Sequence, residues 1–81
     1  MGKRTLESLA KLYYVEDYFD FICQVWLNGE EKLAMNLFND MKSSDKKDFM
    51  NELNYCTFMR KFGDGPWQMD FLHEIIYSLK M

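Results

Sequence analysis

The chain has 81 residues, of which 48% are hydrophobic and 17% aromatic, and its formal net charge is −3 at pH 7. This length fits one domain, and a domain of this size buries only about 60% of the surface that its unfolded chain exposes, so its stability is marginal unless the core is dense or a second subunit contributes. The mild acidity argues against a general nucleic-acid binder, because such proteins neutralise phosphates with Lys and Arg.

The cysteines and the N-terminal residues indicate an intracellular protein. Cys23 and Cys56 are isolated and lack CxxC spacing, which favours reduced, buried thiols. No apolar run follows the basic residues at positions 3 and 4, and Leu6 stands where a myristoylation signal needs Ser or Thr, so neither a secretory leader nor that lipid anchor is expected. Residues 12–27 are too short and too acidic for a membrane-spanning helix, which needs about 20 apolar residues. A cytoplasmic location is therefore expected.

Helical periodicity begins at the N-terminus, where Thr5 has the position of an N-cap. The apolar stripe that follows faces the side that is polar in residues 12–27, so one straight helix would switch its buried face around Tyr14. Two explanations fit this switch. Either the helix breaks near residues 15–17 and Asp17 caps a new helix, or one long helix is buried on different sides along its length. The break is the favoured interpretation.

Residues 12–27 form the most apolar segment of the chain. On helical geometry their apolar arc is about 200° wide, whereas a surface helix needs about 100°. Such a helix is either central to its own fold or presents half of its arc to a partner. The side chains predicted to be core are Leu12, Val15, Phe19, Ile22 and Trp26. Those predicted to lie beside the core face are Tyr14, Tyr18, Phe21 and Val25.

The next four residues, 28–31, are predicted to end this segment and to begin another helix. Gly29 suits a left-handed C-cap, and Asn28 with Glu31 three residues later has the spacing of a capping box. Apolar residues at helical spacing between positions 33 and 41 then predict an amphipathic helix of about three turns.

The second half of the chain is predicted to form two more helices. The first has Ser44 or Asp45 as its N-cap and extends to Phe62. Gly63 suits the position after a helix end and Pro66 the first turn of the last helix, which runs to the C-terminus. Short connections between four or five helices predict an all-α fold, a single compact bundle over residues 1–81 in which sequence neighbours are antiparallel.

No residue pattern in the chain favours catalysis or metal binding. His73 and Glu74 lack the second His of an HExxH motif, and the one histidine and two scattered cysteines do not predict a metal site. Both cysteines lie on apolar helical faces, where burial raises a thiol pKa and makes the thiol unreactive. The glycine-containing turn lacks phosphate-loop spacing, and no calcium-loop pattern occurs. We therefore expect no enzyme, no cofactor, no metal and no small-molecule substrate.

A helix-turn-helix outline in the middle of the chain supplies an alternative function. Lys42, Lys46 and Lys47 lie near the start of the helix that would enter the major groove. Asp45 and Asp48 cancel much of that charge, and any two adjacent antiparallel helices share the outline. A small dimeric helix-turn-helix DNA-binding regulator is therefore the second hypothesis, and nucleic-acid binding is not the favoured one.

Protein binding has the better case, because two groups of aromatic side chains lie beside the predicted core faces. Interfaces are enriched in Tyr, Trp, Phe and Met at their centres. The alternative is that these groups pack against each other or against the last helix. The residues predicted to contact a protein partner are Tyr14, Tyr18, Phe21, Val25, Tyr55, Phe58, Phe62 and Trp67.

The pattern therefore favours a non-enzymatic protein–protein interaction module that acts by steric docking, either as a homodimer or as a small inhibitor or adaptor. An aromatic side chain would fill a pocket of the partner, while Asp17, Asp20, Glu30 and Glu31 complement its basic surface. Short chains without catalytic motifs are common among bacteriophage and mobile-element effectors, which is one interpretation of the origin. A third hypothesis is a small subunit whose apolar surplus is buried permanently in a larger assembly.

Overall fold

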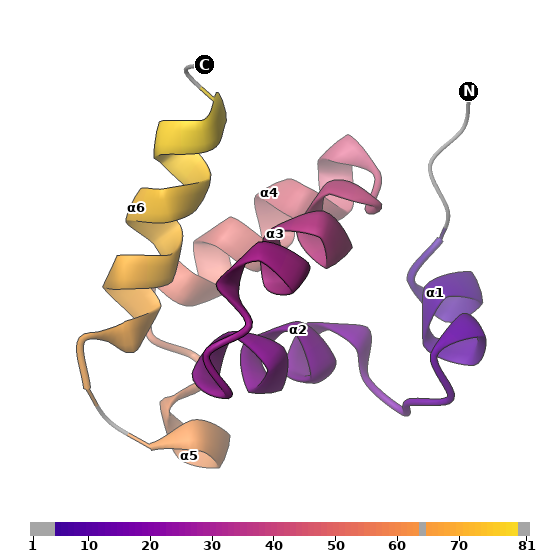
Figure 1. Ribbon diagram of the computed structural model, residues 1–81, viewed down its shortest axis with the longest axis horizontal. Coiled ribbons are helices and arrows are strands. Elements are labelled where there is room, and N and C mark those ends of the chain that lie inside the picture. Colours follow the sequence, from indigo (N-terminus) through magenta and orange to yellow (C-terminus); the bar gives the residue numbers. More distant parts are fainter. Residues whose placement is uncertain (1–4, 64, 80–81) are drawn as a thin grey trace.

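The computed structural model describes residues 5–63 and 65–79 and contains six helices within them (Figure 1). In chain order these helices are α1 (Leu6–Leu12), α2 (Tyr18–Leu27), α3 (Glu31–Asn39), α4 (Ser43–Asn54), α5 (Met59–Phe62) and α6 (Trp67–Leu79). The described residues form no strand, so the all-α prediction is confirmed. The number of helices exceeds the predicted four or five, because the predicted helix that ends at Phe62 is divided into α4 and α5.

The first segment breaks where the favoured interpretation placed the break. The Thr5 Oγ1 accepts a hydrogen bond from the Ser8 N–H at 3.1 Å and caps α1. After α1 ends, the Asp17 carboxylate accepts from the Asp20 N–H at 3.2 Å and caps α2. Side-chain caps of this kind satisfy backbone donors that have no partner inside the helix. Both caps were therefore identified correctly from local sequence.

Of three other predictions of helix boundaries, one is confirmed and two are wrong. Residue Gly29 has φ +92°, as its predicted left-handed position requires. However, Glu30 stands at the N-cap of α3 without a side-chain cap, so the capping box of Asn28 and Glu31 is wrong. Helix α4 begins at Ser43, which excludes Ser44 and Asp45 as its N-cap.

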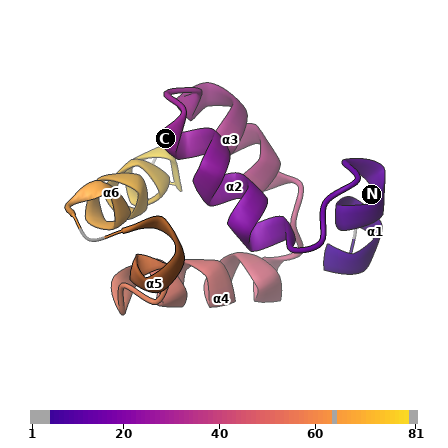
Figure 2. The ribbon, with the colours of Figure 1, turned by 90° about the horizontal axis from the view of Figure 1, so that it is seen from below.

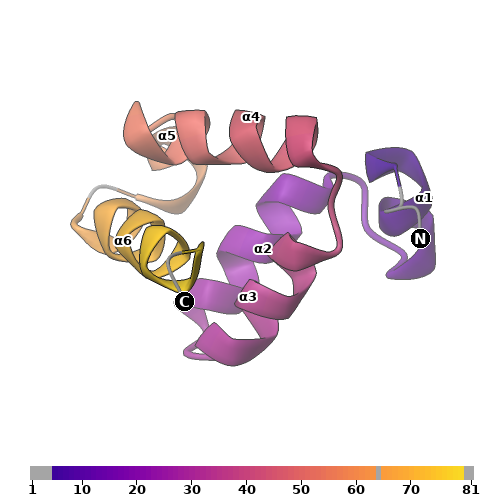
Figure 3. The same cartoon turned by 90° about the horizontal axis from the view of Figure 1, so that it is seen from above.

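The helices pack into a core in which α2 lies against α3, and α4 lies against α6. Figures 2 and 3 show that α4 crosses the α2–α3 pair at a steep angle, so the neighbours α3 and α4 are not antiparallel as predicted. The short connection between them is anchored by Met41, whose side chain is buried. Helix α1 stands to one side of the other helices and packs mainly on α2, through the buried Leu9.

Aromatic rings fill the centre of the core. The Phe49 ring lies within 6 Å of four other rings, with centroid distances of 5.1, 5.8, 5.5 and 5.6 Å to Phe19, Phe38, Phe58 and Phe71. Aromatic pairs at such distances add stability beyond their buried area. Phe49 on α4 therefore packs against rings from α2, from α3, from the turn between α4 and α5, and from α6.

The predicted core set is only partly confirmed. Ile22 and Trp26 are buried, and the Trp26 ring stacks on Phe71 at 4.2 Å. Phe19 is partly buried against the core, and Val15 is half-buried in the connection between α1 and α2. The prediction for Leu12 is wrong, since its side chain is 50% exposed. Leu12 ends α1, so it does not share a helical face with the side chains of α2.

Candidate protein-binding surface

The end of α1 has an unusual residue in a common capping motif. The Tyr14 N–H donates to the Lys11 carbonyl at 3.3 Å, and the Val15 N–H donates to the Ala10 carbonyl at 2.9 Å. This pair of bonds is the Schellman motif, which places its C′ residue in the left-handed region and usually has glycine there. Tyr14 occupies that position with φ +58°. A side chain in this conformation costs about 1–2 kcal/mol relative to right-handed backbone.

The same hydrogen-bond pattern closes α2 and α4, with Gly29 and Cys56 at the left-handed position. The ends of three helices thus share one geometry, and only one of the three residues is a glycine. Cys56, with φ +56°, also explains the division of the predicted helix that ends at Phe62. The residue type does not predict this break, because cysteine rarely adopts positive φ.

Large apolar side chains surround Tyr14 at the surface. Tyr14 is 95% exposed, Leu12 is 50% exposed and Tyr13 is 37% exposed. The Tyr13 ring lies 5.4 Å from that of Phe21, which fixes it against α2. We call Leu12, Tyr13 and Tyr14 the α1–α2 corner. Sequence reasoning placed Leu12 in the core and Tyr13 on the apolar stripe of the first helix, and it did not place Tyr13 among the partner residues. The break before Asp17 was the available signal that both lie at a helix end.

Most of the predicted partner residues on α2 contact the chain's own core. Tyr18 and Val25 are buried, and Phe21 is half-buried, so placing Tyr18 and Val25 beside the core was wrong. The Tyr18 hydroxyl donates to the Leu37 carbonyl on α3 at 2.7 Å. Burial, and then the negative charge of Asp40, raises the pKa of the Tyr18 phenol and keeps it a neutral donor. The wide apolar arc of α2 is therefore filled largely by α3.

The second aromatic group is also largely satisfied within the fold. Phe58 is buried against Phe49, while Phe62 and Trp67 pack edge to face with ring centroids 6.2 Å apart. The buried Gln68 on α6 accepts the Phe58 N–H through its Oε1 at 3.3 Å, which fixes the turn between α4 and α5. This bond joins distant residues, so nothing in the local sequence predicted it.

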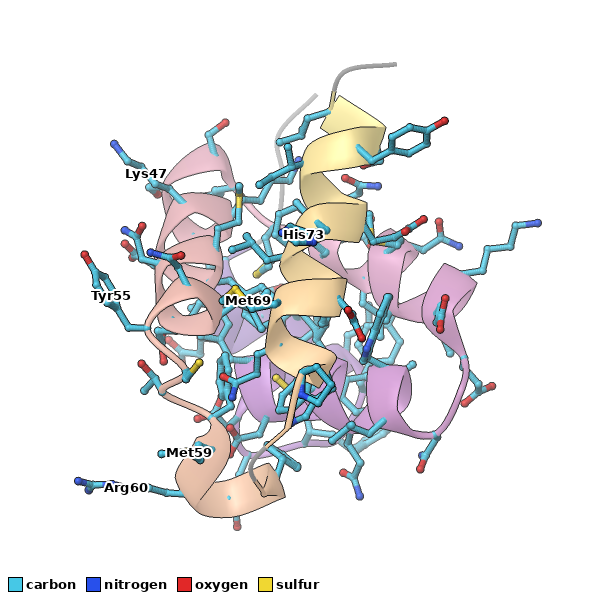
Figure 4. All side chains as sticks on the ribbon, turned by 90° about the vertical axis from the view of Figure 1, so that its left-hand side faces the viewer. Lys47, Tyr55, Met59, Arg60, Met69 and His73 are labelled. Atoms are coloured by element: carbon cyan, nitrogen blue, oxygen red, sulfur yellow. The ribbon has the colours of Figure 1, made fainter. Side chains whose placement is uncertain are left out.

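Tyr55 is the one residue of this second group that is mostly exposed, at 77%. The neighbouring Met59 is 43% exposed. Figure 4 shows the two side chains pointing away from α4 and α5, with Arg60 beside Met59. Helix α1 lies at one end of the longest axis of the molecule, and α5 and α6 lie at the other (Figure 1). The structure therefore does not bring Tyr14 and Tyr55 together into one surface.

Two adjoining grooves flank the connection between α1 and α2. The first has a volume of about 550 Å³, and its apolar lining includes Leu6, Ala10 and Phe19. The second has a volume of about 560 Å³ and extends over α2 toward Lys61 of α5. Val15, Glu16 and Asp17 line both grooves. None of the three corner residues lines either groove, but the corner adjoins the second groove through Tyr13, whose ring contacts the groove residue Phe21.

Some of the charged side chains that line these grooves form ion pairs, and others do not. The Lys11 Nζ lies 3.5 Å from a Glu7 carboxylate oxygen along α1. Lys61 of α5 forms an ion pair with Asp20 of α2, and this hydrogen bond raises the pKa of the Lys61 ammonium. Of the residues that the structure describes, none forms an ion pair with Glu16.

The residues considered for chemistry are not brought together. Within residues 5–63 and 65–79, no group of three or more His, Cys, Asp or Glu side chains is placed to hold a metal ion. His73 is exposed on α6 (Figure 4). Cys23 is buried, and burial followed by the charge of Asp20 raises the pKa of its thiol. A thiol in that state is a poor nucleophile.

The structure contains some of the features that the helix-turn-helix hypothesis needs. Helices α3 and α4 and a short connection exist, as that hypothesis needs, but α3 packs mainly on α2 and α4 mainly on α6. Lys46 lies over the Phe38 ring, with its Nζ 5.8 Å from the centroid. DNA binding stays a prediction. No helix in the described part of the chain has the length and apolar character needed to cross a membrane.

Comparison with known proteins adds no family to these observations. No protein-family model matches the chain, and no curated protein or solved structure is significantly similar to it. The functional argument therefore depends on the geometry of this molecule.

Proposed function

We propose that this chain is a non-enzymatic protein-binding module that docks a partner at the α1–α2 corner. The supporting observation is Tyr14, which is 95% exposed and held at φ +58°. Glycine would fit the same backbone without the steric cost. An aromatic side chain that is kept in a strained conformation, and that is almost wholly exposed, favours a role outside the folded chain.

The chemistry of the corner suits the centre of an interface. Tyrosine supplies a large apolar ring with a polar end and few rotatable bonds, and it is enriched among residues that dominate binding energy. Tyr13 is already fixed against Phe21, so its ring loses little freedom when a partner arrives. A stable interface buries about 800 Å² on each partner. The corner alone is smaller than that, and the adjoining grooves would supply the remainder.

The mode of action in this proposal is steric. The chain would cover a surface of a larger protein as an inhibitor or would join two proteins as an adaptor, and a phage-encoded effector is one setting for either role. Two copies joined through the corner are the alternative within the same proposal.

Three variants test the proposal. Tyr14→Ala removes the ring and keeps the strained backbone, whereas Tyr14→Gly removes both. Each should abolish capture of the partner from a lysate of the source cells, and any self-association in light scattering should fall in parallel. Cys56→Gly relieves the same kind of strain in α4 and leaves the corner intact, so capture should be unchanged. Capture that survives both Tyr14 variants would contradict the proposal.

Tyr55→Ala separates the two exposed aromatic surfaces. Tyr55 is 77% exposed at the far end of the molecule, and its removal should leave capture by the corner unaltered. If Tyr55→Ala abolishes capture and Tyr14→Ala does not, the docking surface lies on α4 and α5 instead.

A further inference from the structure

The two grooves beside the α1–α2 connection share a middle section with carboxylates. The rest of the first groove is largely apolar, whereas the rest of the second is mainly polar. Val15, Glu16 and Asp17 line both grooves. In the first groove the apolar lining comes from Leu6 and Ala10 of α1 and Phe19 of α2. In the second groove it comes from Phe21, which lies among the polar side chains of Asp20, Gln24 and Lys61. A segment lying along this region would therefore meet apolar surface, then the shared carboxylates, and then a mainly polar groove that contains Phe21.

The positive charges in the lining already have acidic partners. Lys11 pairs with Glu7, and Lys61 pairs with Asp20. The shared section retains the carboxylate of Glu16, which no described residue pairs, and that of Asp17, which accepts only the Asp20 N–H among the described residues. A carboxylate has about four lone-pair sites, so both groups can accept further charge-assisted hydrogen bonds.

The negative charge of this region also affects the pKa of a neighbouring carboxyl group, that of Glu52. Burial is the main cause that raises the pKa of Glu52, and the charges of Asp17, Asp48 and Asp20 raise it further. The third cavity of the region, about 260 Å³, is lined by Asp17, Asp20 and Glu52, and also by Arg60 and Lys61 of α5. The carboxylates of Asp17 and Asp20 would therefore attract added positive charge, which the two α5 cations would oppose.

We propose that these grooves bind a cationic amphipathic segment of a partner protein. Its Lys or Arg side chain contacts Glu16 and Asp17, an apolar side chain on one side of that cation fills the first groove, and one on the other side packs on Phe21. An amphipathic helix presents such a pattern with anchors three, four and seven residues apart. This inference rests on the proposed protein-binding function and names the chemistry of the partner.

Charge complementarity favours such a partner over a second copy of the chain. The protein has a net charge of −3, so self-association through this region would bring like charges together. A basic partner would instead be attracted to it, and its association rate would fall as salt is added.

The test uses the full chain, labelled with ¹⁵N, and two synthetic helical peptides with the same leucine spacing. One peptide carries Lys at its polar positions and the other carries Glu. The Lys peptide should shift the amide signals of residues 10, 15–17, 19 and 21, and the Glu peptide should not. Shifts spread evenly over the protein, or equal binding of the Glu peptide, would overturn the proposal.

Matched charge variants separate a specific site from general attraction. Glu16→Gln with Asp17→Asn removes two charges, and Asn retains the cap of α2. This double variant should lower the affinity for the Lys peptide about tenfold, because two exposed ion pairs are lost. Asp70→Asn with Glu74→Gln makes the same charge change on α6, at the other end of the molecule from α1, and should weaken binding of the Lys peptide about twofold or less. Equal weakening in both variants would overturn the groove assignment.

The results also distinguish this inference from the proposed function. If the Tyr14 variants no longer capture the partner but the Lys peptide causes no localised shifts of amide signals, the corner binds a partner of different chemistry. If the peptide binds in the grooves but the Tyr14 variants keep their partner, the corner is not the docking surface.

Discussion

Replacement of Tyr14 by glycine should stabilise the protein, which is unusual for the loss of an aromatic side chain. Relief of the left-handed conformation contributes about 1–2 kcal/mol. Against this, glycine adds about 0.4–1 kcal/mol of conformational freedom to the unfolded chain. The ring is 95% exposed. Its buried remainder, about 10 Å², is worth only about 0.3 kcal/mol. At the middle of these ranges the net effect is a gain of about 0.5 kcal/mol in the free energy of unfolding.

Urea denaturation and thermal melting would measure this gain. The urea midpoint should increase with an unchanged m-value, and Tm should rise by about 2–4 °C for a domain of this size. Tyr14→Ala is the matched control, since it removes the ring and keeps the strained backbone. Its stability should stay within about 0.5 kcal/mol of the wild type. If glycine and alanine at position 14 have the same effect, the reasoning from backbone strain is refuted.

Three further predictions concern the core and its charged surroundings. Tyr18→Phe removes the hydroxyl that donates to Leu37 and should cost about 0.5–1.5 kcal/mol in urea denaturation; an unchanged midpoint would contradict a buried bond. Because the fold raises the pKa of Glu52, this group favours folding below its unfolded pKa and loses that contribution as pH rises through the folded value. Glu52→Gln should therefore stabilise the protein at pH 7, with the difference vanishing near about pH 3; a difference that persists in acid would have another cause. Cys23 should react with a thiol reagent only after unfolding, whereas labelling in the native protein would show that it is accessible.

The parts of the fold that depend on neighbouring residues could be predicted from the sequence. Thr5 and Asp17 cap their helices through residues three positions away, and Gly29 is a residue type suited to its backbone. The wide apolar arc of α2 was correctly identified, but its occupant was not. Whether Tyr18 meets a partner or α3 depends on packing between helices, which periodicity does not encode.

The candidate site was predicted least well, because it arises where the residue type and the backbone disagree. Tyr14 and Cys56 adopt a conformation for which their residue types give no signal. The helix end at Cys56 became recognisable only through the hydrogen bonds of the capping motif, whereas the change of apolar face around Tyr14 had already indicated a helix end there. Such disagreements between local preference and structure are expected where a protein has a functional surface.

The position of α1 at the side of the molecule has a consequence for its motion. Because α1 packs mainly on α2, its amide hydrogens can exchange with solvent through opening of that helix, without unfolding of the other five. The Phe49-centred part of the core would retain slow exchange during such an opening. A partner that contacts both α1 and α2 would close this opening, so slower exchange in α1 would mark the bound state.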